Sequence, residues 1–383
     1  PPPPYRAPDT LHSRSFATVQ DLISEGEIEG FASASKAQLT KGTTAYDNAS
    51  LKDIFLNDTP ILDVNASNSS PADTDFNFKD VVFKSRFGTS SQTALSGIPA
   101  ESRSPTGVGV IVTTSSPVTR QITNTDVDAV IVTLTWPQIQ VAEDDGDLRG
   151  DTVEYKIQIQ HDSGGFVDKV VSSVSGRTAD AYQKDHRIEL TSGFTTVDVR
   201  VLRVTADSTE SNRVNAFQFT SLQEVIDNSS TYANSAYTAL RFDSKQFNRI
   251  PTRKYRIRGV KVRIPGAGAS GTGTPTVDIQ TGRIIYPSGY VFNGVMGAAT
   301  YTNCPAMCLL DLLTNTRYGL GNHIVDSNID LFSFVAASKY ANEEVDDGTG
   351  SGAKEARFSC NVNIQSPKEA FAAINDLAGV MRC

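Results

Sequence analysis

The chain has 383 residues and a formal net charge of −8. This length is enough for two or three domains with sizeable cores. The acidic balance gives no general attraction to nucleic acid or to anionic membranes. The sequence has no run of about 18 apolar residues, so it predicts no membrane-spanning helix.

Both ends of the sequence look cut. The chain begins with Pro1-Pro-Pro-Pro-Tyr5 rather than with Met, and it stops at Cys383 directly after an apolar, helix-like run. We therefore expect a fragment of a longer polypeptide. Residues 1–15 are proline-rich and polar, which predicts an extended arm that gains order by lying on a neighbour.

Residues 16–104 predict a first scaffold part made of short strands and turns. A hairpin is expected over Ile54–Val64, because Asn57 and Asp58 at its centre tolerate the positive φ of tight turns. A further strand is expected over Phe76–Phe83.

Residues 105–222 predict an inserted β-sandwich of the fibronectin type III or immunoglobulin class. About seven short strands separated by turns are typical of that architecture. Trp136 is the single tryptophan and is expected in the core. No cysteine pair supports an antibody-type domain, so the fibronectin-like version is favoured. The clearest alternating runs are Val108–Val112, Val130–Trp136, Val153–Gln160, Val170–Val174, His186–Leu190 and Thr196–Val204.

Residues 223–300 predict a second scaffold part with a flexible glycine-rich loop at 265–275. Its strand Lys254–Ile264 alternates cations with apolar residues. The resulting basic stripe is either a solvated strand face or a contact with an acidic neighbouring subunit. Nucleic acid is disfavoured, because no stacking aromatics are interleaved. The stripe consists of Lys254, Arg256, Arg258, Lys261 and Arg263.

Residues 301–383 predict an α+β segment that is truncated at its end. Helices are expected over 304–315, near Ile329–Glu344, and from Ser366 onward, where Ser366 caps and Pro367 takes the first helical position. A strand is expected over Arg357–Ile364. Overall, the fold class is mainly β with a minor α+β part, in a multidomain scaffold.

The four cysteines, all in the last 80 residues, leave several interpretations open. They are Cys304, Cys308, Cys360 and Cys383. Two disulfides are arithmetically possible, and so is a metal site with His323, although a tight second ligand pair is missing. Buried thiols that behave as small apolar groups in a reducing cytosol are favoured.

Other motif-like runs do not indicate a metal or a cofactor. Gly266-x-Gly268-x-x-Gly271 is followed by Thr274-Pro275 and a strand pattern, whereas a dinucleotide fingerprint requires a helix there. Glu143–Asp147 and Asp326–Asp330 suggest calcium loops. The second lacks the required glycine and glutamate, and the first fits a solvated turn better. We therefore expect no metal and no cofactor.

No catalytic set is recognisable either. The four histidines lie in unrelated segments, and the usual nucleophile, zinc and phosphate-loop motifs are absent from the sequence. Sequence alone leaves open that a scattered carboxylate pair meets in space. We expect that the chain is not an enzyme.

Several segments that keep one order across nearly the whole chain resemble a single family. They are Ala7–Leu11, Val19–Gly30, Leu51–Ile61, Arg120–Val130, Leu240–Phe247, Ile250–Gly259, Pro305–Gly321 and Phe358–Gln365. Together they resemble the N-terminal hub part of the tail-tip attachment (host-specificity) protein J family of lambda-like siphophages. Cys304 departs from this pattern, because a polar residue is expected there, so no cysteine-based site is carried over.

The resemblance implies a structural virion protein made in the host cytoplasm. As a homotrimer it would close the tail tube, carry fibronectin-like domains outside, and anchor the central fibre. It would contact other tip and distal tail proteins and enclose the end of the tape-measure protein. On infection it would open so that the tape-measure protein and DNA leave. The receptor would be bound by a C-terminal part absent here, and phage DNA would be met only in transit.

A second hypothesis is a tail-associated cell-wall or carbohydrate hydrolase with a fibronectin-like module. It requires a carboxylate pair about 5–10 Å apart in a cleft. A surface adhesin that binds through its sandwich is a third.

Overall fold

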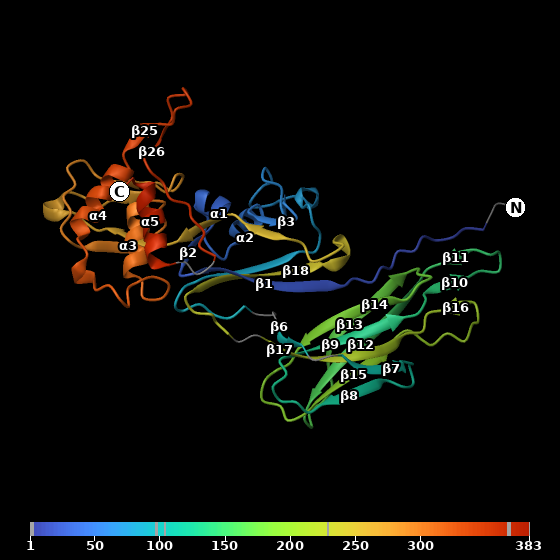
Figure 1. The fold of residues 1–383 in the computed structure, drawn as a ribbon. Coiled ribbons are helices and arrows are strands. Elements are labelled where there is room, and N and C mark those ends of the chain that lie inside the picture. The colour runs from blue at the N-terminus through green and yellow to red at the C-terminus, as the bar shows by residue number, and fades with distance from the viewer. Residues whose placement is uncertain (1–3, 96–98, 103–104, 228–229, 366–368, 383) are drawn as a thin grey trace. The chain divides into compact units, whose positions relative to one another are not determined.

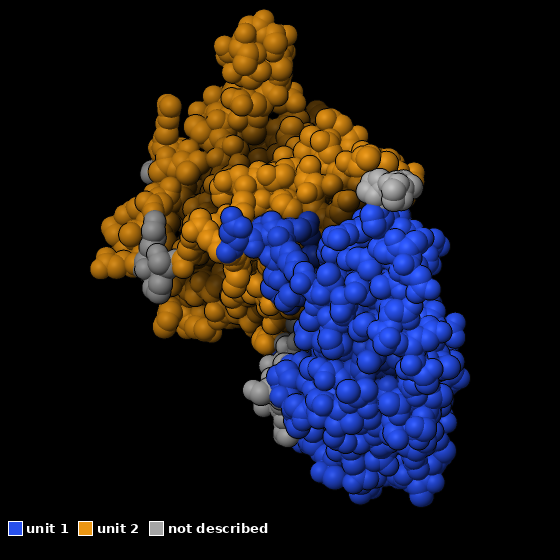
Figure 2. Space-filling model, turned by 90° about the vertical axis from the view of Figure 1, so that its right-hand side faces the viewer, with its two compact units in different colours: residues 1–17, 94–230, 243–248 blue, residues 18–93, 231–242, 249–383 orange. Residues whose placement is uncertain are grey.

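The computed structural model describes residues 4–95, 99–102, 105–227, 230–365 and 369–382 (Figure 1). Contacts divide the chain into two compact units (Figure 2). Unit 1 comprises Pro1–Ala17, Ala94–Ser230 and Asp243–Asn248, and unit 2 comprises Thr18–Thr93, Thr231–Phe242 and Arg249–Cys383. Strands dominate both units and helices are few, so the predicted fold class is confirmed. The predicted domain boundaries stay predictions.

Unit 1 is a β-sandwich (Figure 1). One sheet has the strand order β13-β12-β15-β8, and the other has the order β14-β9-β17-β6, with β7 also pairing with β17. A small third sheet has the order β11-β10-β16. The strands are β6 Pro99–Ser102, β7 Thr106–Ile111, β8 Val118–Ile122, β9 Ala129–Trp136, β10 Gln140–Ala142, β11 Leu148–Arg149, β12 Asp151–His161, β13 Val167–Gly176, β14 Tyr182–Glu189, β15 Val197–Arg203, β16 Arg213–Val214 and β17 Gln218–Asp227.

The core of the sandwich follows from the period-two pattern of its strands. Successive side chains of a strand point to opposite faces, so every second residue of β15 is buried, beginning with Val197 and Val199. Trp136 is fully buried, as predicted, and stacks on Phe217 with ring centroids 5.0 Å apart. Burying one such large apolar side chain contributes roughly 1.5–3 kcal/mol.

The first and last strands of the sandwich pair with each other. Strands β6 and β17 are antiparallel, and Pro99 lies opposite Asp227. The chain therefore enters and leaves the sandwich at neighbouring positions. This is the geometry that an inserted domain requires.

The N-terminal arm lies on the sandwich of its own chain. The amide of Ala7 donates to the Leu148 carbonyl at 2.8 Å, and the amide of Thr10 donates to the Arg177 carbonyl at 3.0 Å. The Arg177 guanidinium also pairs with Asp9 at 2.7 Å. The expectation that a neighbour orders the arm is therefore wrong for its described residues.

Unit 2 is built around a sheet of order β1-β18-β5, in which β18 is the central strand (Figure 1). The predicted hairpin is confirmed, because Asn57 and Asp58 have φ values of 48° and 67° between β3 and β4. The elements are β1 Phe16–Glu25, β2 Ile28–Phe31, α1 Ala32–Lys36, α2 Thr44–Leu51, β3 Ile54–Leu56, β4 Thr59–Pro60, a 3₁₀ turn Asp73–Asp75, β5 Val82–Phe87, β18 Ser235–Asp243 and a 3₁₀ turn Ser244–Gln246.

Two features of this scaffold differ from the sequence prediction. Helix α1, and helix α2 with its cap at the Thr43 hydroxyl, lie where only strands and turns were expected. The strand predicted over Phe76–Phe83 is wrong, because β5 begins at Val82. A positive φ of 56° at Asp80 interrupts the extended backbone before it.

The rest of unit 2 contains three helices and several two-stranded sheets. Helices α3 and α4 match the predicted helices, whereas the predicted cap at Ser366 and Pro367 lies outside the described residues. The elements are β19 Arg253–Tyr255, β20 Ile257–Val260, β21 Val262–Pro265, a 3₁₀ turn Ala269–Gly271, β22 Thr276–Val277, β23 Ile284–Ile285, β24 Met296–Thr300, α3 Pro305–Thr314, a 3₁₀ turn Asp326–Asn328, α4 Leu331–Ala341, β25 Glu344–Asp346, β26 Lys354–Ala356 and α5 Ala370–Val380.

Helix α3 anchors the core of this region. Pro305 is its first residue, and the chain beyond the helix folds back, so that the Leu320 amide donates to the Leu312 carbonyl at 2.8 Å. A side chain at Gly321 would come within 2.1 Å of the Thr314 carbonyl oxygen. The predicted strand Arg357–Ile364 is wrong, because that segment pairs with no strand in the described part of the chain.

We predict that the sandwich loses stability as pH falls from about 6.5 towards 4. Burial lowers the pKa of His186 from 6.5 to about 4. Below pH 6.5 the His186 ring binds a proton in the unfolded chain, whereas in the folded chain it stays neutral until the pH approaches 4. The free energy of unfolding should fall by about 2 kcal/mol over this pH interval. Urea unfolding at pH 7 and pH 4.5, followed by the fluorescence of Trp136, measures it.

His186→Gln is the matched variant, because it removes the titrating ring. Its stability should fall less than that of the natural chain over the same pH interval. Equal losses in the two proteins would contradict the assignment to His186.

Candidate functional site

The five basic residues predicted as a stripe do not form one strand face. They lie on or between β19, β20 and β21, which pair with three different strands, β3, β2 and β24. The single strand predicted over Lys254–Ile264 is therefore wrong.

The side chain of Arg256 is 54% exposed, but it pairs with a buried carboxylate. Its Nε donates to Asp53 Oδ1 at 2.7 Å, and Asp53 is fully buried. The same carboxylate accepts a hydrogen bond of 2.9 Å from the Ser33 hydroxyl and one from the Ser33 amide. A buried carboxylate that lost its cation would keep its desolvation penalty without compensation.

Two of the lysines have carboxylate partners in the chain. Lys254 pairs with Asp58, and both side chains are exposed. Lys261 pairs with Glu27 at 2.7 Å and lies 3.8 Å from Glu29. Exposed pairs of this kind contribute little to stability. They do, however, neutralise much of the charge that the sequence pattern suggested.

Arg258 is buried, with only 4% of its surface exposed. Its Nη2 donates to the Gln280 carbonyl at 3.0 Å, and the guanidinium lies 5.0 Å from the centroid of the Tyr301 ring. Arg263, in contrast, is exposed, and its charge acts on the Asp311 carboxyl, whose pKa it lowers against the larger opposite effect of burial. It is therefore the member of the predicted set that is best placed for a contact with another subunit.

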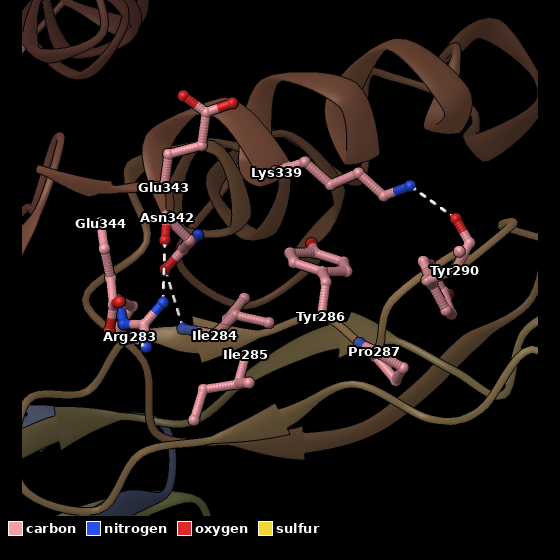
Figure 3. A pocket seen from close by; sticks show the side chains of 11 residues that line it. Arg283, Ile284, Ile285, Tyr286, Pro287, Tyr290, Lys339, Asn342, Glu343 and Glu344 are labelled. Carbon is pink, nitrogen blue, oxygen red and sulfur yellow. Dashed lines mark hydrogen bonds and ion pairs between the residues drawn. The ribbon is translucent and has the colours of Figure 1, made fainter.

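Sequence analysis missed a pocket of about 420 Å³ beside α4 (Figure 3). The Lys339 ammonium donates to the Tyr290 carbonyl at 2.7 Å, and Arg283 pairs with Glu344 at 2.6 Å. Burial raises the pKa of Tyr286, whose hydroxyl donates to Ser338 at 2.7 Å. These polar groups have hydrogen-bond or ion-pair partners within the chain, and these contacts hold the pocket wall in place.

The pocket does not display a nucleophile paired with a base. Glu343, on its rim, pairs with Arg357 at 2.6 Å. Its chemistry is that of a hydrogen-bonding surface with two tyrosine rings. Its lining comes from β23, the loop after it and the end of α4. Because β23 and α4 are distant in sequence, a local sequence pattern could not predict the pocket.

Three cysteines, Cys304, Cys308 and Cys360, are free thiols in the structure. Cys304, the residue before α3, is fully buried, with its sulfur 3.2 Å from the Ser338 hydroxyl. Among the described residues, three metal-ligand atoms lie within 4.8 Å of one another only at an acidic turn, so the thiols form no such trio there.

That acidic turn contains Glu143, Asp145 and Asp147, between β10 and β11. Arg149 lies 3.1 Å from Glu143, and the Tyr5 amide donates to Asp147 at 2.7 Å. These contacts give the carboxylates partners within the chain. Acidic turns at a protein surface commonly have such partners without binding a metal.

Comparison with known proteins identifies relatives of this chain. Residues 102–228 match the family model described as tip attachment protein J, FNIII-A domain. The chain is 31% identical to tip attachment protein J of Escherichia phage SECphi4 over 98% of its own length, and 29% identical to that of Escherichia phage SECphi27 over 87%. The predicted resemblance to the tip attachment protein J family is confirmed.

The chain spans 30% of the length of the first tip attachment protein J and 26% of the second. Among solved structures, the receptor binding domain of the spike protein P1 from bacteriophage PM2 matches 32% of this chain and 93% of its own. The TM-score is 0.23 and the identity 12%. A likeness at that level supports no argument about fold or function.

We predict opposite roles for two of the basic residues. Arg256→Ala should lower the free energy of unfolding by about 2 kcal/mol, because it strands the buried Asp53. Arg263→Ala is the matched control, since the loss of an exposed side chain should change stability by less than about 0.5 kcal/mol. Urea unfolding followed by far-ultraviolet circular dichroism gives both values. Equal values for the two variants would contradict this division.

Proposed function

We propose that this chain is part of a structural tip attachment protein of a phage tail, located at the tail tip of the virion. The observation that carries the proposal is the similarity to tip attachment protein J across 98% of the chain. The match of residues 102–228 to the FNIII-A domain of tip attachment protein J also supports it. In this role the chain acts by assembly rather than by bond chemistry.

More specifically, we propose a homotrimeric hub that closes the tail tube. It contacts other tail-tip and distal tail proteins and encloses the end of the tape-measure protein. It opens for ejection of the tape-measure protein and DNA, and a further part of the whole protein anchors the fibre and meets the host receptor. The net charge of −8 fits a lumen through which DNA slides, because like charges do not adhere.

An exposed apolar patch in unit 2 supports the subunit contact. It comprises Val291, Val295 and Phe332, which are 55%, 60% and 59% exposed, and we call it the Phe332 patch. The Phe332 ring packs edge-on against Phe292 with centroids 5.2 Å apart, and Gly294 lies beside it. Neighbouring large apolar side chains left in water are typical of surfaces that another protein covers.

We predict that the chain is a trimer in solution and that the double variant Val295→Ser, Phe332→Ser is a monomer. The substitutions remove apolar area from the contact but leave the buried side chains in place. Size-exclusion chromatography with light scattering measures the mass, and circular dichroism checks the fold.

Val171→Ser is the matched control, because Val171 is 69% exposed but lies on the sandwich strand β13. It should remain a trimer. A natural chain that is monomeric at all concentrations would contradict the trimer. A double variant that stays trimeric would remove the Phe332 patch from the interface.

A further inference from the structure

The loop between β23 and β24 contains the single Asn-Gly pair of the sequence, Asn293-Gly294. Asn293 is exposed and lies between Val291 and Val295, two residues of the Phe332 patch. Gly294 has a φ of 87°, in the left-handed region that favours glycine. Asparagine is thermolabile, because a backbone amide nitrogen can displace the nitrogen of its side chain. The patch therefore contains a reactive amide at its centre.

Three features of the loop favour attack of the Gly294 amide nitrogen on the side-chain carbonyl of Asn293. The Val295 amide donates to Asn293 Oδ1 at 2.9 Å, so it would stabilise the negative charge that this oxygen gains during the attack. In the described part of the chain the Gly294 amide donates no hydrogen bond, so the attacking nitrogen is not engaged elsewhere. Glycine has no Cβ, which leaves the path of approach open.

We propose that Asn293 is a self-modifying residue, which the folded loop converts into aspartate or isoaspartate. The Gly294 nitrogen loses its proton and forms a bond to Asn293 Cγ. The bond between Cγ and Nδ2 then breaks, and Nδ2 takes up the proton and leaves as ammonia. Water opens the resulting cyclic imide at either of its two carbonyls. The net reaction consumes one water and releases one ammonia, and nothing is oxidised or reduced.

The product places a carboxylate in the middle of the Phe332 patch. Its consequence for assembly rests on the subunit contact proposed above. A carboxylate buried in an apolar interface without a cation keeps its desolvation penalty. A chain that has reacted should therefore fail to assemble, whereas an assembled chain keeps water away from the loop and retains the amide. The residue thus limits the time during which a free chain can join the tail.

Ageing of the folded double variant Val295→Ser, Phe332→Ser at pH 8 tests the chemistry, because no contact through the patch then covers the loop. The variant retains the backbone amide of residue 295. Peptide mapping by mass spectrometry at intervals follows the loss of each side-chain amide. Gly294→Ala in the same background should slow the reaction of Asn293, and circular dichroism confirms that each variant is folded.

Asn57 is the internal control in the same peptide map. It is exposed and its Oδ1 accepts the Thr252 amide at 3.0 Å, but Asp58 follows it instead of glycine. Asn293 should lose its amide at least about tenfold faster than Asn57. The chemistry is overturned if Asn293 reacts no faster than Asn57, or if it stays intact in the folded variant while it reacts in urea.

Asn293→Asp tests the consequence for assembly, with Asn293→Gln as the matched control that keeps a neutral amide. Light scattering should find a trimer for Asn293→Gln and a monomer for Asn293→Asp. If Asn293→Asp forms trimers as the natural chain does, the consequence for assembly is overturned. A natural chain that is itself monomeric would contradict the proposed trimer, and the peptide map would still decide whether Asn293 modifies itself.

Discussion

Strand β18 imposes the constraint on which the scaffold depends. It is the central strand of the sheet β1-β18-β5, and its residues from Ser235 to Leu240 are buried. Strands β1 and β5 precede the sandwich in the chain, whereas β18 follows it. The sheet can form only if the chain that leaves the sandwich returns to where it entered. Pairing of β6 with β17 meets this requirement, because it places Pro99 opposite Asp227 and so shortens the loop that β18 has to close.

The polar contacts of unit 2 divide its surface into parts that hold the fold and parts left for partners. The buried carboxylate of Asp53 accepts hydrogen bonds from Ser33 and from the exposed Arg256, so this basic surface residue also holds the fold. The Phe332 patch and Arg263, in contrast, are exposed. A subunit of a closed assembly requires this combination, with an internally satisfied scaffold and apolar surface that only other chains can cover.

The sequence predicted what depends on local pattern and missed what depends on distant partners. The sandwich strands and Trp136 were predictable, because period-two alternation over many residues allows few other folds. The run Lys254–Ile264 has the same alternation, yet it divides among three partners that no local pattern records. Helix α2 is short and its buried face is small, so its signal was weak. The pocket beside α4 joins segments far apart in the chain, which a single sequence does not reveal.

The central claim is that this chain forms a closed, three-copy ring at the tail tip. Electron cryomicroscopy of intact tails from the phage that encodes it tests the claim most directly, by giving the symmetry and copy number of the chain in the particle. The account predicts three copies around a closed lumen, with the sandwich outside. A single copy at the tip, or tails that lack the chain at the tip, would contradict it.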